Sequence, residues 1–258
     1  MNVQLLDAID EKFKNNLLER GQNTYIKMIV TGHVLEVYEY EKTPVLPSEK
    51  KKLKSNNLNL DNIEFDNKLT DRQNNMQKAR NRVRRLITAN FDENSKFITL
   101  TFKDNLKDVK QANYEFMKFI QRMRYRYGSF KYITVIEFQK RGAVHYHMIS
   151  DLPYIENDEL RKIWGHGFVK INDISHVDNV GAYMIKYMTK DNADMRLQGL
   201  KSYQTSKNLI RPIEFVGTEA EKIMKLYELD NKKTVFSNHY ETEYLGLATY
   251  KEFNLKRL

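Results

Sequence analysis

The sequence contains no cysteine among its 258 residues. Disulfide bonds and thiolate zinc sites are therefore impossible, which excludes disulfide-stapled architectures and zinc fingers. No apolar segment approaches the length that spans a bilayer, and the first residues lack the basic leader and apolar run of a signal peptide. We expect a cytoplasmic protein with no membrane partner.

A glycine followed by lysine is also missing throughout the sequence, so there is no phosphate loop of the G-x-x-x-x-G-K type. The sequence therefore predicts no ATP-driven helicase. Positive charge is in excess instead, with a formal net charge of +9 and a pI near 9.3, which indicates an anionic partner and favours nucleic acid over a membrane. Sixteen tyrosines and thirteen phenylalanines are available to stack on unpaired bases, although most aromatic side chains in any domain belong to its core.

The most informative segment is 135–147, VIEFQKRGAVHYH, which is typical of a β-hairpin. Residues two apart in a strand share a face, so His145 and His147 project together. A three-residue loop over 140–142, with glycine at its left-handed position, pairs Glu137 with His145 and adds a carboxylate to the imidazoles. A two-residue turn would instead place Glu137 on the opposite face.

Nitrogen and oxygen ligands in this mixture suit a divalent ion such as Mn²⁺ or Mg²⁺ that keeps positions open for substrate oxygens. The alternative is a histidine pair without metal, with one ring buried and hydrogen-bonded and the other in solvent. If Glu137 faces away from the imidazoles, His166 and His176 are the next candidates for the third ligand.

A second pattern lies in residues 179–191, NVGAYMIKYMTKD. On a helix, its phenols and ammoniums alternate along one stripe, formed by Tyr183, Lys186, Tyr187 and Lys190. A neighbouring ammonium favours the phenolate, which is the nucleophilic form of tyrosine. The alternative is an ordinary amphipathic helix whose lysines extend to solvent and whose tyrosines pack.

Three segments, in this order, resemble the motifs of the HUH endonuclease superfamily, and specifically the replication initiators of rolling-circle plasmids and single-stranded-DNA phages. The strand 97–102, FITLTF, is similar to the first motif, and His145-Tyr146-His147 is similar to the second, the paired-histidine metal motif. The segment 183–190, YMIKYMTK, is similar to the third motif in its two-tyrosine form. The resemblance covers roughly residues 95–195.

This resemblance implies an enzyme that nicks and rejoins DNA at a single-stranded or hairpin origin. It implies that Glu137, His145 and His147 hold the ion and that Tyr187 or Tyr183 forms a 5′-phosphotyrosine linkage. Charge on the phosphate would be balanced by Lys186 or Lys190. A host helicase and a host DNA polymerase would be partners. The alternatives are a transposase or relaxase of the same superfamily, and a non-catalytic, RRM-like nucleic-acid-binding protein.

The order of elements indicates an α+β fold of ferredoxin-like or RRM-like type, an antiparallel sheet with helices on one face. The predicted elements are strand 97–102, helix 106–127, strand 131–139, strand 143–150, helix 156–164, strand 167–173 and helix 176–192. The resemblance implies the same sheet, with the metal ligands on its central hairpin.

Around this core we expect an N-terminal helix and strand extension over 1–46 and a linker or mobile loop over 47–70. The nicking domain, led by a basic helix at 71–87, covers 71–195, and a basic, strand-rich extension covers 196–258. Phosphate contacts are expected from the basic helix and from segment 201–211, through Arg80, Arg82, Arg84, Arg85, Lys201 and Lys207. A solvated charged face is the alternative for the helix.

Overall fold

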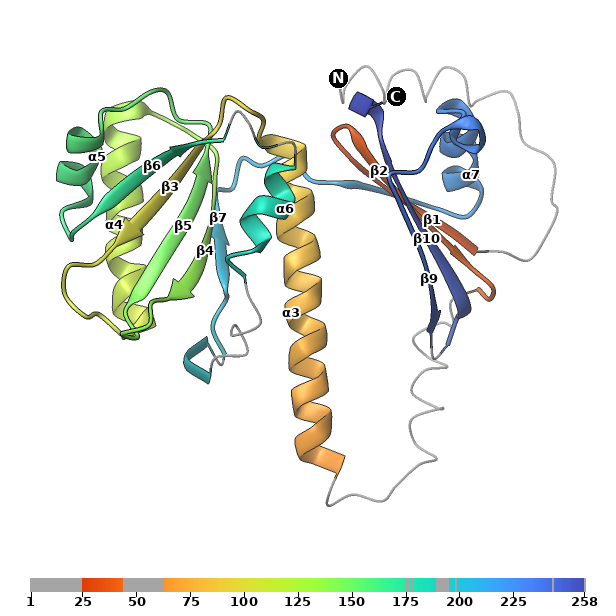
Figure 1. Cartoon of the computed structure of the whole chain (residues 1–258), viewed down its shortest axis with the longest axis horizontal. Helices are drawn as coiled ribbons and strands as arrows, with labels where there is room; N and C mark the ends of the chain where they lie inside the picture. The colour runs from red at the N-terminus through yellow and green to blue at the C-terminus, as the bar shows by residue number, and fades with distance from the viewer. Residues whose placement is uncertain are drawn as a thin grey trace. The chain divides into compact units, whose positions relative to one another are not determined.

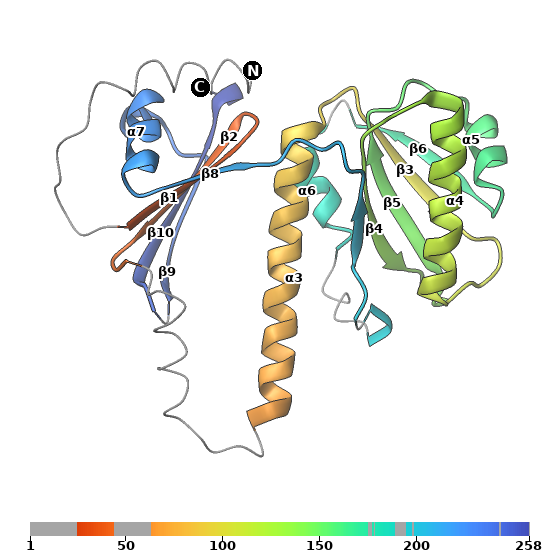
Figure 2. The same ribbon diagram turned by 180° about the vertical axis from the view of Figure 1, so that it is seen from behind.

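The computed structural model of the chain divides into two compact units (Figures 1 and 2). We call Asn59–Arg211 the central unit, and Met1–Leu58 with Pro212–Leu258 the terminal unit. No helix in the described part of the chain is long and apolar enough to cross a membrane. The structure describes residues 25–43, 63–174, 177, 179–188, 195–197, 199–242 and 244–257.

The central unit is built on an antiparallel sheet with the strand order β6-β3-β5-β4-β7. Along the chain, the first four strands alternate with helices in the order β3, α4, β4, β5, α5, β6. The predicted ferredoxin-like α+β fold is confirmed, and β7 adds a fifth strand beside β4. The elements are β3 Lys96–Thr101, α4 Val109–Tyr127, β4 Tyr132–Phe138, β5 Val144–Ser150, α5 Asn157–Trp164, β6 Val169–Asp173 and β7 Tyr203–Thr205.

One face of this sheet is covered by α4 and α5. Helix α4 begins at an N-cap, Asp108, whose carboxylate accepts hydrogen bonds from the backbone of Lys110 and Gln111, and it ends before Gly128. Its apolar residues recur at helical spacing and are fully buried against the sheet. This core includes Ala112, Phe116, Phe119, Ile120, Met123, Leu100, Tyr146 and Trp164.

The opposite face is covered by α3, Ile63–Asn90, and α6, Val180–Ile185, as Figures 1 and 2 show. Apolar side chains from both helices pack on the odd-numbered residues of the central strands. At Gly181 the two helices approach closely: a Cβ there would lie 3.0 Å from the carbonyl oxygen of Arg84. The core on this face includes Val83, Leu86, Ile87, Phe97, Ile133, Val135, Ile149, Met184 and Met188.

Two helix boundaries differ from the sequence prediction. Helix α3 begins at Ile63, inside the segment 47–70 that the sequence predicts to be a linker; residues 47–62 lie outside the described part. The predicted helix 176–192 is described only over Val180–Ile185. After it, the backbone N–H of Tyr187 bonds to Met184 and that of Met188 to Ile185, three residues back, which tightens the chain into a turn.

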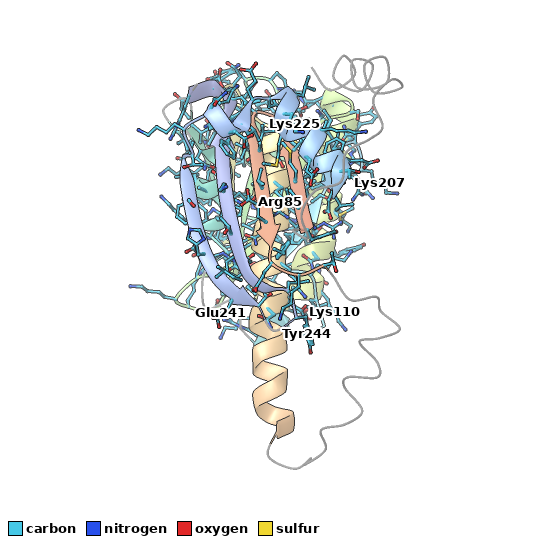
Figure 3. The ribbon with its side chains drawn as sticks, turned by 90° about the vertical axis from the view of Figure 1, so that its right-hand side faces the viewer. Arg85, Lys110, Lys207, Lys225, Glu241 and Tyr244 are labelled. Atoms are coloured by element: carbon cyan, nitrogen blue, oxygen red, sulfur yellow. The ribbon has the colours of Figure 1, made fainter. Side chains whose placement is uncertain are left out.

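The terminal unit joins strands from both ends of the chain in one antiparallel sheet, β8-β1-β2-β10-β9. The sequence placed these strands in two separate extensions, but β1 pairs with β8 and β2 with β10. Helix α7 packs on one face, and Figure 3 labels Lys225 on it and Glu241 and Tyr244 near the β9–β10 connection. The elements are β1 Tyr25–Thr31, β2 Val34–Tyr40, β8 Ile213–Val216, α7 Thr218–Leu226, β9 Phe236–Thr242 and β10 Gly246–Asn254.

Candidate active site

The β4–β5 hairpin has the three-residue loop that the sequence predicts. The backbone N–H of Gln139 donates to the carbonyl of Ala143 over 2.9 Å, and Gly142 adopts a φ of 88°, in the left-handed region that favours glycine. Glu137 lies directly opposite His145 in the ladder. The predicted register is therefore confirmed, and the carboxylate stands on the same face as the imidazoles.

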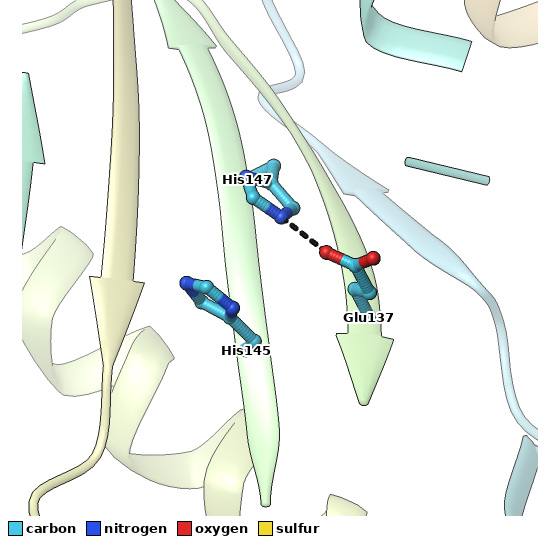
Figure 4. Close-up of side chains that lie close together, drawn as sticks. All are labelled: Glu137, His145 and His147. Carbon is cyan, nitrogen blue, oxygen red and sulfur yellow. Dashed lines mark hydrogen bonds and ion pairs between the residues drawn. The ribbon is translucent and has the colours of Figure 1, made fainter. Parts of the chain in front are cut away.

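The three side chains form a compact cluster, the Glu-His-His cluster (Figure 4). One ligand atom from each of Glu137, His145 and His147 lies within 4.8 Å of the others. The Nε2 atom of His147 is 2.6 Å from Oε2 of Glu137, and the two imidazole rings are 4.7 Å apart between centroids. His147 is buried and the other two are partly buried, so the cluster stands at the border between core and solvent.

Two threonines of β3 hold the imidazoles from behind. The Thr99 hydroxyl is 3.2 Å from Nδ1 of His147, and the Thr101 hydroxyl is 3.1 Å from Nε2 of His145. Each threonine is the ladder partner of the histidine that it contacts. Because a hydroxyl both donates and accepts, Thr99 can hold His147 in either tautomer.

Sequence reasoning did not assign a role to these threonines. The available signal was their alternation in FITLTF, which places both on one face of a strand. Only the pairing of β3 with β5 shows that this face is the one that carries the histidines.

The hairpin tip is tied to the end of β3 and to residues near β7. The Arg141 guanidinium donates to the carbonyls of Phe102 and Lys103, over 2.5 and 3.2 Å. Arg196 donates to the Gly142 carbonyl, and its guanidinium carbon lies 3.7 Å from the ring centroid of Phe138. These contacts fix the strand ends from which Glu137 and His145 project.

Both tyrosines of the third motif lie against the cluster. The ring of Tyr187 is 3.9 Å from the ring of His147 between centroids, and Phe97 contacts Tyr183 and Tyr187 at 5.2 Å each. The Tyr187 hydroxyl donates to the Tyr183 hydroxyl over 3.1 Å. The structure therefore brings two phenols and a candidate metal centre to one point of the sheet.

The charges at this point are set by burial and by hydrogen bonds. Burial lowers the pKa of His145 to about 4, an effect that His147 reinforces and the Glu137 charge opposes. The hydrogen bond to His147 lowers the pKa of Glu137, although burial acts in the other direction. At neutral pH, therefore, His145 is neutral and Glu137 ionised, which are the protonation states of metal ligands.

The pKa of Tyr187 is raised, first by burial and then by its hydrogen bond to Tyr183 and by the charges of Tyr183 and Glu137. This direction is opposite to the one that the tyrosine–lysine stripe predicted. Because the helix ends at Ile185, the stripe does not continue: Lys186 is exposed, with its Nζ 5.7 Å from the Tyr183 ring centroid. Lys190 lies outside the described residues, as does His176.

The residues predicted to contact phosphate are spread along α3 and β7. On α3, Arg82 is exposed, and the Nε of Arg80 is buried without a hydrogen-bond partner among the described residues. Figure 3 labels Arg85 on α3 and Lys207. Exposed Lys201 and Lys207 stand before and after β7. The structure brings none of them into the Glu-His-His cluster.

One protein family matches this part of the chain. Residues 95–192 match the sequence model of a family described as replication-associated protein ORF2. The matched segment contains β3, the hairpin with the Glu-His-His cluster, and both tyrosines. No curated protein and no solved structure matches the chain. By this similarity, residues 95–192 support assignment of the chain to a replication initiator family.

Proposed function

We propose that the chain is a rolling-circle replication initiator of the HUH endonuclease type, which nicks and rejoins single-stranded origin DNA through a 5′-phosphotyrosine intermediate. The observation that carries the proposal is the contact of Tyr187 with His147, 3.9 Å between ring centroids, inside a segment similar to replication-associated proteins. A nucleophile and a metal-ligand set in contact are the two parts that metal-assisted attack on a phosphate requires.

The ligand set fits a divalent cation of the Mn²⁺ or Mg²⁺ class. Glu137, His145 and His147 would hold the ion, with Thr99 and Thr101 fixing the orientation of the imidazoles. When bound, the cation would polarise the scissile phosphate and offset the negative charge of Glu137. Three protein ligands leave coordination positions for phosphate oxygens.

The protein's contribution to cleavage is to position a phenol and to manage its proton. The Tyr187 oxygen forms a bond to phosphorus, and the bond from phosphorus to the 3′ oxygen breaks, which leaves a free 3′-OH on one fragment. The phenolic proton of Tyr187 already points to the Tyr183 oxygen, which gives it a first acceptor. Since the pKa of Tyr187 is raised without metal, the attack depends on positive charge at the cluster.

The second tyrosine gives the site a second acceptor for the DNA end. With their hydroxyls 3.1 Å apart, Tyr183 and Tyr187 can address the same phosphate position after small side-chain rotations. Rejoining is the reverse attack by a 3′-OH on the phosphotyrosine. Lys186, and Lys190 further along, would balance charge on the phosphate in transit. A host helicase and polymerase would separate the strands and extend the free 3′-OH.

Formation of a covalent adduct tests this proposal without knowledge of the origin. A random-sequence pool of single-stranded oligonucleotides, labelled at the 3′ end, is incubated with the protein and Mn²⁺ or Mg²⁺ and run on a denaturing gel. The label is expected to migrate with the protein, because the downstream fragment stays on the tyrosine. EDTA, His145→Ala and His147→Ala should each abolish the adduct.

Tyr125→Phe is the matched control, because this tyrosine is 97% exposed on α4, over the other face of the sheet. It should form the adduct at the wild-type level. Absence of any adduct with wild-type protein, while the strands still bind, would leave a non-catalytic nucleic-acid-binding protein as the better description.

A further inference from the structure

The face that carries the Glu-His-His cluster continues across β3 onto β6, the edge strand of the central sheet. Lys170 is the ladder partner of Thr99, the threonine that contacts His147. Opposite residues of antiparallel strands share a face. Lys170 therefore projects on the side of the cluster, and it is exposed.

The residue two positions earlier extends this row. The backbone N–H of Thr101 donates to the carbonyl of Phe168 over 2.9 Å, which continues the β3–β6 register by one more pair. Phe168 thus stands beside Thr101 as Lys170 stands beside Thr99. Its side chain is 60% exposed, although large apolar side chains are usually buried. An exposed aromatic and an exposed cation are therefore neighbours on one edge.

The chain reaches this position through a close approach that only glycine permits. Gly167 has a φ of 148°, and a Cβ there would lie 2.5 Å from the backbone nitrogen of Lys103. The segment before β6 is thus pressed against the end of β3, and the carbonyl of His166 accepts a hydrogen bond from Lys103. The backbone of Phe168 is fixed by these contacts while its ring remains in solvent.

From this geometry we propose that Phe168 and Lys170 form a subsite for the single strand beside the scissile phosphate: Phe168 stacks on an unpaired base and Lys170 contacts a backbone phosphate. Two strand spacings separate them from the histidines, which is about 10 Å. A strand whose phosphate reaches the cluster therefore passes over them. The inference rests on the proposed function for the identity of the strand as DNA.

Stacking on Phe168 requires a base whose face is free, so the subsite selects single strands over duplexes. Base–aromatic stacking is tolerant of sequence, whereas a phosphate contact by lysine appears in the salt dependence of binding. The two residues therefore have separate experimental signatures.

Binding of a fluorescent oligo(dT) strand, measured by anisotropy in EDTA with full-length protein, tests the inference. Phe168→Ala should weaken binding on the order of tenfold and leave duplex binding unchanged, and Phe168→Trp should restore it. Lys170→Ala should reduce the slope of log K against log salt by about 0.7 for the single strand. Tyr125→Ala and Lys110→Ala, exposed on α4, are the controls and should match wild type.

Oligo(dT) binding by Phe168→Ala at the wild-type level, equal losses for single strand and duplex, or no binding by the wild-type protein would overturn the stacking role. An unchanged salt slope in Lys170→Ala would overturn the phosphate contact. These measurements involve no cleavage. Failure of the proposed function shows instead as absence of a metal-dependent adduct in protein that binds the strand through Phe168.

Discussion

At the scale of single residues, the candidate site depends on hydrogen bonds that fix ring orientation. His147 is held at both nitrogens, by Glu137 at Nε2 and by Thr99 at Nδ1. A metal ligand that is already oriented loses less conformational entropy when the ion binds, and the partner of its second nitrogen fixes the tautomer. Thr99 is buried, so water does not readily replace its hydroxyl.

Thr99→Val keeps the size of the side chain and removes only this hydrogen bond. We expect Mn²⁺ affinity, measured by isothermal titration calorimetry, to fall by about 10–100-fold. Thr99→Ser, which retains a hydroxyl, should bind Mn²⁺ nearly as wild type does. Thr205→Val, on edge strand β7, is the matched control. Equal Mn²⁺ affinity in Thr99→Val and wild type would show that the ring is oriented by packing alone.

The two tyrosines are distinguishable by phenylalanine substitutions. Since both hydroxyls meet next to the cluster, Tyr183→Phe and Tyr187→Phe should each retain some adduct formation, with the greater loss in Tyr187→Phe. The double variant should form none. Mass spectrometry of the adduct should locate DNA on the remaining tyrosine of each single variant. Complete loss in Tyr187→Phe alone would establish a single-tyrosine mechanism.

At the scale of elements, a short helix carries the first tyrosine and leads directly to the second. Helix α6 covers six residues, and a helix of this length is held by tertiary packing more than by its own hydrogen bonds. Gly181 supplies that packing, because the absence of a side chain lets α6 rest on the backbone of α3 at Arg84. The Cγ of Arg84 also touches this position, so part of its side chain serves packing.

Gly181→Val should push α6 away from α3 and displace the tyrosines from the cluster. We expect a loss of about 1–3 kcal/mol in the free energy of unfolding by urea. Adduct formation should fall strongly while Mn²⁺ affinity stays near wild type, since the ligands are on another element. Ala182→Val, at the next and only half-buried position, is the control. Parallel losses of metal affinity and adduct would mean that α6 also supports the hairpin.

At the scale of the whole molecule, the excess of positive charge sets the affinity for DNA. A formal net charge of +9 favours any polyanion, and release of counterions makes such binding dependent on salt. Exposed Arg82 on α3 and exposed Lys201 and Lys207 beside β7 are separate from the Glu-His-His cluster. Binding and chemistry are therefore expected to be separable by mutation.

Arg82→Gln and Arg85→Gln together should weaken duplex binding across sequences. The slope of log K against log salt should fall by about 0.9 for each phosphate that the protein no longer neutralises. Adduct formation at saturating DNA should be preserved, as read from the same denaturing gels. A duplex-binding salt slope equal to that of wild type would identify the arginines of α3 as a solvated or structural face.

Local features of the sequence determined the hairpin, its register and the ligand set. Strand alternation places His145 and His147 on one face, and a glycine-containing loop fixes Glu137 opposite His145, because both effects act between residues close in the chain. The spacing of Tyr183 and Tyr187 likewise predicted that their hydroxyls meet, although not through a continuous helix.

Only the tertiary structure decided the contacts between segments far apart in the sequence. The pairing of β3 with β5 makes Thr99 and Thr101 partners of the histidines, and the pairing of β3 with β6 brings Phe168 and Lys170 to the same face. The pairing of β2 with β10 joins two predicted extensions in one sheet. Such pairings are chosen by packing of the whole core, and the early end of α6 follows from its fit against α3 and the sheet, neither of which a local pattern encodes.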